Sequence, residues 1–183
     1  AGCAEAGLLE GLAEPVLQAC GAEDLNALAR TGTAAVRQLR ARATELLSNP
    51  GQRRKTEPHL IAQESALMRM PFRIGDYTDF YASIHHATNV GRLFRPDTPL
   101  LPNYKWVPIG YHGRASSIVV SGTKIRRPSG QNKSPDMSAP TFSPATMLDY
   151  ELEVGFFVGK GNALGQPVPI DEAEQHTFGL CLV

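Results

Sequence analysis

The sequence predicts an α+β protein in which strands dominate, because a helical pattern of apolar residues is followed by a longer part with strand patterns. Before residue 50, apolar side chains recur at helical spacing, whereas later segments are short strand-like runs between turns rich in proline and glycine. The chain has 183 residues, of which 42% are hydrophobic. That content suits one globular domain, or one small domain with part of another.

The first clear element is a predicted helix after Thr33, which we expect to be its N-cap. Four apolar side chains follow at spacings of three and four: Val36, Leu39, Ala43 and Leu46. The sequence SNPG at residues 48–51 supplies a stop, and a charged connector covers residues 51–59. We therefore expect residues 1–70 to be the largely helical remainder of an N-terminal domain with its connector, and residues 71–183 to begin a second domain.

Strand-like segments dominate the second part of the chain. SSIVVSG at residues 116–122 and YELEVGFFVG at residues 150–159 lie between turn-forming residues. GLCLV at residues 179–183 is typical of a buried strand, and the chain begins with Ala rather than Met. We expect the chain to be a fragment that lacks both ends.

Charge and composition narrow the class of partner. The chain has 18 basic and 18 acidic residues, so no overall field favours nucleic acid or an anionic membrane. The basic segment 124–133 has no aromatic residue to stack on a base. No run of 18 apolar residues and no signal peptide is found, which predicts a cytoplasmic protein. Three widely spaced cysteines, Cys3, Cys20 and Cys181, predict reduced thiols.

Chemistry concentrates in GDYTDFYASIHHATNVG, residues 75–91. We expect a short helix that Asp79 caps and that ends near residues 89–91. On such a helix Asp79 and His86 share one side, about 10 Å apart along the axis, which is too far for one metal to bind both. The carboxylate would hold a cation and the imidazole would act as a base. The alternative is that Asp79 only caps the helix and His86 is a surface histidine.

A second acidic group lies in LDYELEVGFF, residues 148–157. Glu151 and Glu153 are two apart in a predicted strand, so both carboxylates project from one face and repel each other unless a cation lies between them. Oxygen ligands favour magnesium or calcium over zinc. The alternative is a solvated strand face.

Hydrogen-bond donors form a third group. Tyr81, Arg95 and Tyr111 suit anionic oxygens, and an arginine in particular matches a carboxylate. Each of them also has a purely structural alternative, as a buried tyrosine with a satisfied hydroxyl or as an arginine in a surface ion pair.

Several unusual strings together resemble the fumarylacetoacetate hydrolase family: GDYTDFY, HHATNVG, GYHGRASSIVVSGT, IRRPSGQ and LDYELEVGFFVGKGNALG, in this order. The resemblance runs from about Glu23 to the last residue. It implies a small N-terminal barrel-like domain, partial here, followed by the start of a mixed β-sandwich or roll domain that carries the active site. It also implies a homodimer.

The activity implied by the resemblance is metal-dependent hydrolysis of the carbon–carbon bond of 4-fumarylacetoacetate to fumarate and acetoacetate, the last step of tyrosine breakdown. Residue by residue, it gives Asp79, Glu151 and Glu153 as ligands of Mg or Ca, and His86 as the base that activates water. It gives the donors named above, Tyr81, Arg95 and Tyr111, as substrate contacts.

Two sets of alternatives remain open at this point. Relatives on the same scaffold hydrolyse acylpyruvates or decarboxylate oxaloacetate, and a non-catalytic binding module would keep the same fold. The resemblance also implies a further aspartate ligand, a lysine and a histidine-orienting glutamate beyond Val183. We therefore expect the 183-residue chain alone to be inactive.

Overall fold

The computed structural model describes residues Ala1–Val183. The chain forms two compact units, one of Ala1–Phe72 with Gly122–Val183 and one of Arg73–Ser121. Three antiparallel sheets of two strands each accompany the helices, and none closes into a barrel. An α+β class is confirmed, but more residues lie in helices than in strands, so the predicted dominance of strands is wrong.

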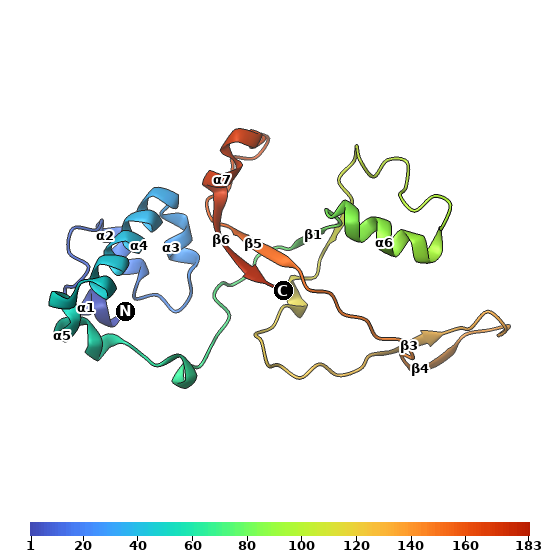
Figure 1. Cartoon of the computed structure of the whole chain (residues 1–183), viewed down its shortest axis with the longest axis horizontal. Helices are drawn as coiled ribbons and strands as arrows, with labels where there is room; N and C mark the ends of the chain where they lie inside the picture. Colours follow the sequence, from blue (N-terminus) through green and yellow to red (C-terminus); the bar gives the residue numbers. More distant parts are fainter. The chain divides into compact units, whose positions relative to one another are not determined.

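Helices make up the regular structure of the first 72 residues (Figure 1). The α-helices are α1 (Gly2–Glu5), α2 (Glu14–Ala19), α3 (Asn26–Arg30), α4 (Thr33–Ser48) and α5 (Arg53–Thr56). Three 3₁₀ turns complete this part: η1 (Pro50–Gln52), η2 (Glu57–His59) and η3 (Gln63–Ser65). The largely helical character expected here is what the structure has, while the division into domains after residue 70 stays a prediction.

The longest helix, α4, confirms the periodicity of its sequence. Leu46 is buried with Leu8 and Leu9, and Val36 and Leu39 pack against buried Val16, Ala19 and Leu28. The helix begins one residue after Gly32, whose φ of 87° provides the turn, so Gly32 rather than Thr33 is the N-cap.

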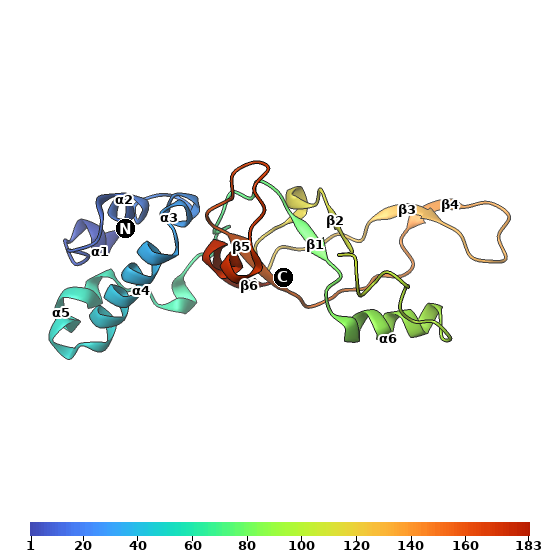
Figure 2. The ribbon, with the colours of Figure 1, turned by 90° about the horizontal axis from the view of Figure 1, so that it is seen from above.

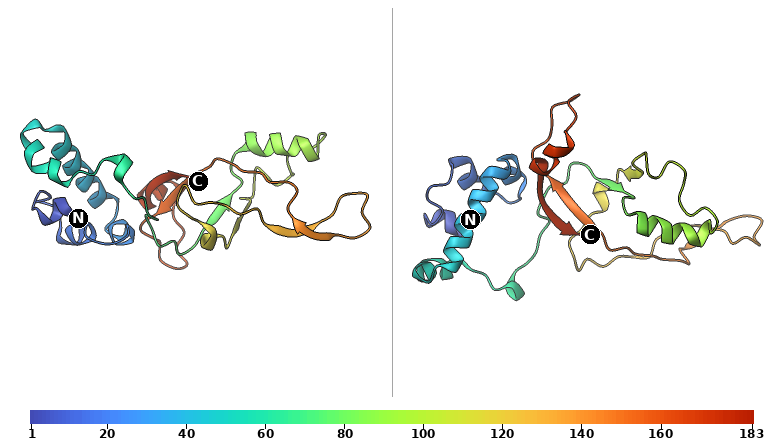
Figure 3. Two further views of the ribbon diagram at one scale, coloured as in Figure 1. Left: turned by 90° about the horizontal axis from the view of Figure 1, so that it is seen from below. Right: turned by 45° about the horizontal axis from the view of Figure 1, so that its top comes forward.

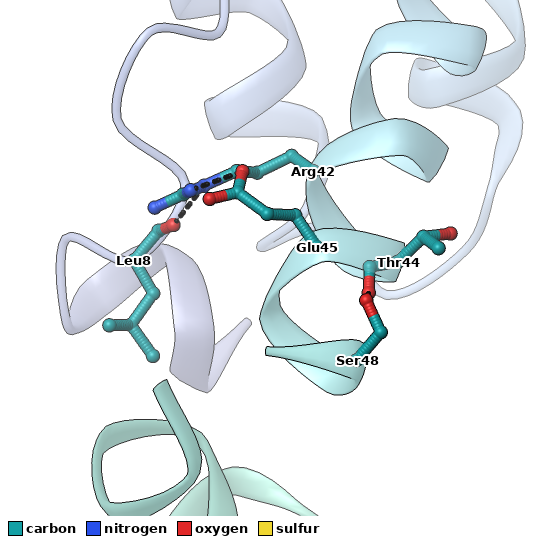
Figure 4. Close-up of polar contacts among 5 residues, drawn as sticks. All are labelled: Leu8, Arg42, Thr44, Glu45 and Ser48. Atoms are coloured by element: carbon teal, nitrogen blue, oxygen red, sulfur yellow. Dashed lines mark hydrogen bonds and ion pairs between the residues drawn. The ribbon is translucent and has the colours of Figure 1, made fainter. Parts of the chain in front are cut away.

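One side chain of α4 also contacts the turn between α1 and α2 (Figure 4). Arg42 donates from Nε to the backbone oxygen of Leu8 at 2.8 Å, and its Nη1 pairs with Glu45 at 2.7 Å. The arginine therefore joins the helix to the first residues of the chain.

The strands β5 (Val154–Val158) and β6 (Thr177–Leu182) pair antiparallel, with η5 (Ile170–Glu172) and α7 (Ala173–His176) in the connection between them. Both strands lie side by side in Figures 1 and 3. Phe72 holds the pair to the helical part of the same unit. Its ring stacks on Phe157 with centroids 4.3 Å apart and meets Phe178 edge-on at 5.2 Å.

The strands β3 (Ser129–Asn132) and β4 (Thr141–Pro144) form a separate antiparallel pair, visible in Figure 2. The Asn132 amide donates to the Ser143 hydroxyl at 2.7 Å and to the Ser143 backbone oxygen at 3.0 Å. This pair belongs to the first unit but contributes no residue to the predicted site.

The unit Arg73–Ser121 holds β1 (Thr78–Phe80), α6 (Ile84–Phe94), β2 (Gly110–His112) and the turn η4 (Ala115–Ser117). The strands β1 and β2 pair antiparallel. The run SSIVVSG was expected to be a strand, and that expectation is wrong: its first residues form η4, and residues 118–120 belong to no sheet. A β-rich composition favours a strand only where a partner strand supplies the ladder.

Two expectations about the whole chain can be compared with the structure. Among the helices, none combines the length and the apolar character that crossing a membrane requires. Cys3, Cys20 and Cys181 are all free thiols, each partly buried.

Candidate active site

Asp79 lies in the middle of β1, directly opposite Tyr111 of β2. Residues directly opposite in an antiparallel pair present their side chains on one face, as do residues two apart on one strand. Tyr77 precedes Asp79 by two, and its hydroxyl donates to Oδ2 of Asp79 at 2.7 Å. The Tyr111 hydroxyl donates to the same oxygen at 2.9 Å. One carboxylate oxygen thus accepts from two phenols.

The expected helix from Asp79 is therefore wrong. Asp79 pairs in a strand, and α6 begins at Ile84, where the Ser83 hydroxyl accepts from the backbone N–H of His86 at 3.3 Å. Serine is a preferred N-cap in its own right, so the cap four residues after Asp79 leaves the aspartate free to join the sheet. Asp79 and His86 do not share one helix face.

The expected end of this helix is also wrong. The helix α6 continues through Gly91 to Phe94. Gly91 is buried, and a Cβ there would lie 2.1 Å from the backbone oxygen of Pro99. This glycine allows a close approach of the chain and does not end the helix.

His86 lies on the first turn of α6, against Tyr81. The two rings meet edge-on with centroids 5.3 Å apart, and both side chains are half-buried. On its other side Tyr81 meets Tyr104 at 6.0 Å, and the Tyr104 hydroxyl donates to the backbone oxygen of Tyr81 at 3.0 Å. The structure therefore brings the predicted base and one predicted substrate contact together.

A pocket of about 330 Å³ opens beside Tyr81. It is lined by Phe80, Tyr81, Ala82, Tyr104, Lys105, Trp106, Val107, Pro108 and Ile109. The sequence reasoning missed residues 104–109, because they lie in a proline-containing loop without a motif. The one signal in the sequence for this pocket was YKW, residues 104–106, in which two aromatic residues flank a lysine.

Arg95, the predicted carboxylate contact, follows the last residue of α6. It is exposed, and its guanidinium donates to the backbone oxygen of Pro99 at 3.3 Å. The structure thus joins Arg95 to the loop that packs on Gly91 and not to Asp79.

Glu151 and Glu153 precede β5. Glu153 exchanges two backbone hydrogen bonds with Val183, at 2.9 and 3.0 Å, so it extends the β5–β6 ladder by one residue. Along this strand Glu153, Gly155 and Phe157 are half-buried, whereas Glu151 is exposed. Both glutamates were expected in one strand. Only Glu153 joins the backbone ladder, whereas Glu151 lies in irregular chain before it.

A metal site is not assembled in the structure. No group of three or more His, Cys, Asp or Glu side chains is arranged to hold a metal ion. Asp79 belongs to one unit, and Glu151 and Glu153 belong to the other. The donor set is carboxylate oxygen only, which fits a hard divalent cation. The predicted ligand set stays a prediction.

Comparison with known proteins identifies the family. The family described as "Fumarylacetoacetate (FAA) hydrolase C-terminal" matches residues 76–183. The seven predicted site residues all lie inside this match. The match covers more than half of the chain. It agrees with the resemblance seen in the motifs.

Curated relatives point the same way. Fumarylacetoacetase of Caenorhabditis elegans is 51% identical over 166 residues, covering 87% of this chain and 40% of the relative. The fumarylacetoacetase of Homo sapiens is 49% identical over 165 residues, covering 87% and 39%. That of Oryza sativa is 42% identical over 195 residues, covering 100% and 44%. The chain spans about 40% of the length of these relatives, and it belongs to the fumarylacetoacetate hydrolase family.

Proposed function

We propose that the full-length protein hydrolyses the carbon–carbon bond of 4-fumarylacetoacetate, giving fumarate and acetoacetate. The observation that carries this proposal is the cluster in Arg73–Ser121, where a doubly hydrogen-bonded carboxylate and a tyrosine-packed histidine occur within one family match. The relatives named fumarylacetoacetase support the choice of substrate.

Asp79, Glu151 and Glu153 would hold the divalent cation that the family implies, Mg or Ca. Both hydrogen bonds to Asp79 use Oδ2, so Oδ1 is the oxygen that suits a ligand. When bound, such a cation supplies a Lewis acid for the two oxygens of a diketone and for the enolate that leaves.

His86 would take a proton from water, whose oxygen then bonds to the carbonyl carbon. The carbon–carbon bond breaks with its electron pair on the departing acetoacetate, which takes up a proton. The edge-on contact with Tyr81 and the Ser83 N-cap of α6 support the position of the imidazole.

Tyr81, Arg95 and Tyr111 would contact the substrate. Tyr81 lines the pocket of about 330 Å³. Arg95 is held by one hydrogen bond to a backbone oxygen, so a substrate carboxylate offers it a stronger, charge-assisted partner. Tyr111 already donates to Asp79, which connects a substrate contact to a metal ligand.

Finer features of the family also belong to this proposal. They are a barrel-like N-terminal domain, a β-sandwich or roll around the site, a homodimer and a cytoplasmic location.

The test follows the loss of fumarylacetoacetate absorbance with the full-length protein, with and without Mg²⁺ or Ca²⁺. His86→Ala should lower kcat by about 10² to 10⁴-fold, the usual contribution of a positioned base. His85→Ala is the matched control, because His85 is the exposed neighbour on the same helix.

Acylpyruvate and oxaloacetate, assayed in parallel, separate the alternatives on this scaffold. Faster turnover of either one than of fumarylacetoacetate would overturn the proposed substrate. Cation binding without turnover of any of the three would favour a binding module.

A further inference from the structure

The Asp79 carboxylate, in the middle of β1, accepts two side-chain hydrogen bonds on one oxygen. Two phenol hydroxyls, from Tyr77 and Tyr111, donate to its Oδ2 at 2.7 and 2.9 Å, and neither uses Oδ1. The three side chains share one face, because Tyr111 is the cross-strand partner of Asp79 and Tyr77 lies two residues before it.

We propose that Tyr77 is a positioning residue that orients Asp79 toward a divalent cation. The inference rests on the proposed function only in taking Asp79 as a metal ligand. Tyr77 has no role among the substrate contacts, and its hydroxyl makes the shorter of the two hydrogen bonds to Asp79.

The physical reason lies in the freedom of an aspartate side chain. Its terminal torsion is broad, so an unheld carboxylate exchanges its two oxygens readily. Two donors on one oxygen remove that exchange and leave Oδ1 for the cation. Partners of this kind, which hydrogen-bond a ligating carboxylate, typically change metal affinity by about 10 to 100-fold when they are removed.

Tyr77 is itself well placed for this task. Its side chain is half-buried, and its ring lies 6.4 Å from that of Tyr111 at an interplanar angle of 55°. Each ring limits the movement of the other, so the hydroxyls converge on Asp79 from two different strands. The Asp79 carboxylate is therefore already oriented in the folded protein, so that cation binding loses less side-chain entropy.

The experiment measures Ca²⁺ and Mg²⁺ binding to the full-length protein by isothermal titration calorimetry without substrate. Tyr77→Phe keeps the ring and removes the hydroxyl, and we expect the affinity to fall by about 10-fold or more. Tyr104→Phe is the matched control. It makes the same change in the same unit, but its hydroxyl donates to a backbone oxygen and not to a carboxylate.

Each outcome decides something. Weaker binding in Tyr77→Phe with unchanged binding in Tyr104→Phe supports the inference. Equal affinity of Tyr77→Phe and the parent protein overturns it while the proposed hydrolase stands. No cation binding by the parent protein removes the metal site, and the inference with it, whether or not turnover is seen.

A second variant guards against a folding defect. If circular dichroism shows that Tyr77→Phe has lost structure, Tyr111→Phe removes the other donor to the same oxygen. Unchanged cation affinity in a folded Tyr111→Phe protein would then overturn the inference that hydrogen bonds to Oδ2 orient Asp79.

Discussion

The two sheets that carry the predicted metal ligands are built by different forces. The pair β5–β6, which Glu153 extends, is held by ring packing of Phe72 on Phe157 and Phe178. The pair β1–β2, which carries Asp79, is joined by a short antiparallel ladder, and on one face two phenol hydroxyls converge on the Asp79 carboxylate. Glu153 therefore depends on apolar packing, and Asp79 depends on directed hydrogen bonds.

The two sheets differ in how precisely they can orient a side chain. The hydrophobic effect that drives packing is non-directional, whereas a hydrogen bond depends on its angle, so two hydrogen bonds to one oxygen restrict the torsion of its side chain. Only one face of β5–β6 is packed in this way. On the opposite face Phe156 is 59% exposed and Leu180 is 72% exposed. We expect changes at the two sheets to separate into effects on stability and effects on ligand geometry.

The largest expected effect breaks the packing under β5–β6. Phe72 is 7% exposed and contacts rings from both strands. Phe72→Ala should lower the free energy of unfolding by about 3 kcal/mol, because it removes a large buried ring and leaves a cavity. Urea unfolding measures this change. Phe142→Ala, at a side chain 77% exposed on β4, should cost less than about 0.5 kcal/mol. Equal losses would refute the anchoring role of Phe72.

The next change disturbs the β1–β2 pair at the backbone of Asp79, without altering its carboxyl group. A Cβ at Gly110 would lie 2.3 Å from the backbone oxygen of Asp79, which cannot move without losing the ladder. Gly110→Ala should cost about 2 kcal/mol in unfolding free energy. Unlike Phe72→Ala, it should also weaken cation binding, since Asp79 itself is displaced.

A matched glycine tests the reason for that loss. Gly130 lies in β3, and a Cβ added there would have no other atom within 4 Å. Gly130→Ala should leave both the unfolding midpoint and the cation affinity nearly unchanged. A loss as large as that of Gly110→Ala would mean that close backbone approach is not the cause, since Ala in a strand is by itself no worse than Gly.

The sequence predicted best where local periodicity and burial agree. The helix α4 follows its apolar spacing because Leu46, Val36 and Leu39 all pack on the core of the same unit. The prediction was wrong at Asp79, because an aspartate before a helix-like segment is typical of an N-cap, whereas this aspartate pairs in a strand. The decisive partner, Tyr111, is 32 residues away and leaves no local trace.

The candidate site was predicted in part for the same reason. The residue types around Asp79 and His86 were visible in the sequence, but their arrangement depends on the register between β1 and β2. The contact of Tyr77 with Asp79 was not predicted, because Asp79 was expected to cap a helix, whereas in a strand a tyrosine two residues before an aspartate shares its face.

A smaller effect concerns the start of α6, which follows β1 and carries His86. Ser83→Ala removes the hydroxyl that accepts from His86 N–H at 3.3 Å. We expect a loss of about 0.5 to 1 kcal/mol in unfolding free energy, at the low end for an N-cap because the bond is long. Ser48→Ala in α4 is the control, since its hydroxyl donates to Thr44 within the helix and caps nothing. Equal changes in both variants would show that Ser83 is not a cap.

The least destabilising change concerns Asp136, an acid that lies in neither of these two sheets. A hydrogen bond from the Ser134 side chain, aided by the backbone N–H of Asp136, lowers the pKa of Asp136 below its ordinary value. A lowered pKa in the folded state stabilises the protein above the pKa of the unfolded chain, and this contribution is lost as the pH falls through the folded value.

Ser134→Ala should therefore raise the pKa of Asp136 toward its ordinary value, as followed by NMR titration of its side-chain carboxyl. The carboxyl is fully exposed, so solvent screens the interaction and the unfolding midpoint at neutral pH should hardly move. An unchanged pKa would contradict the role of Ser134. A single hydroxyl on an exposed acid thus changes its titration without holding its geometry, whereas the two phenols on half-buried Asp79 fix which oxygen is left for a ligand.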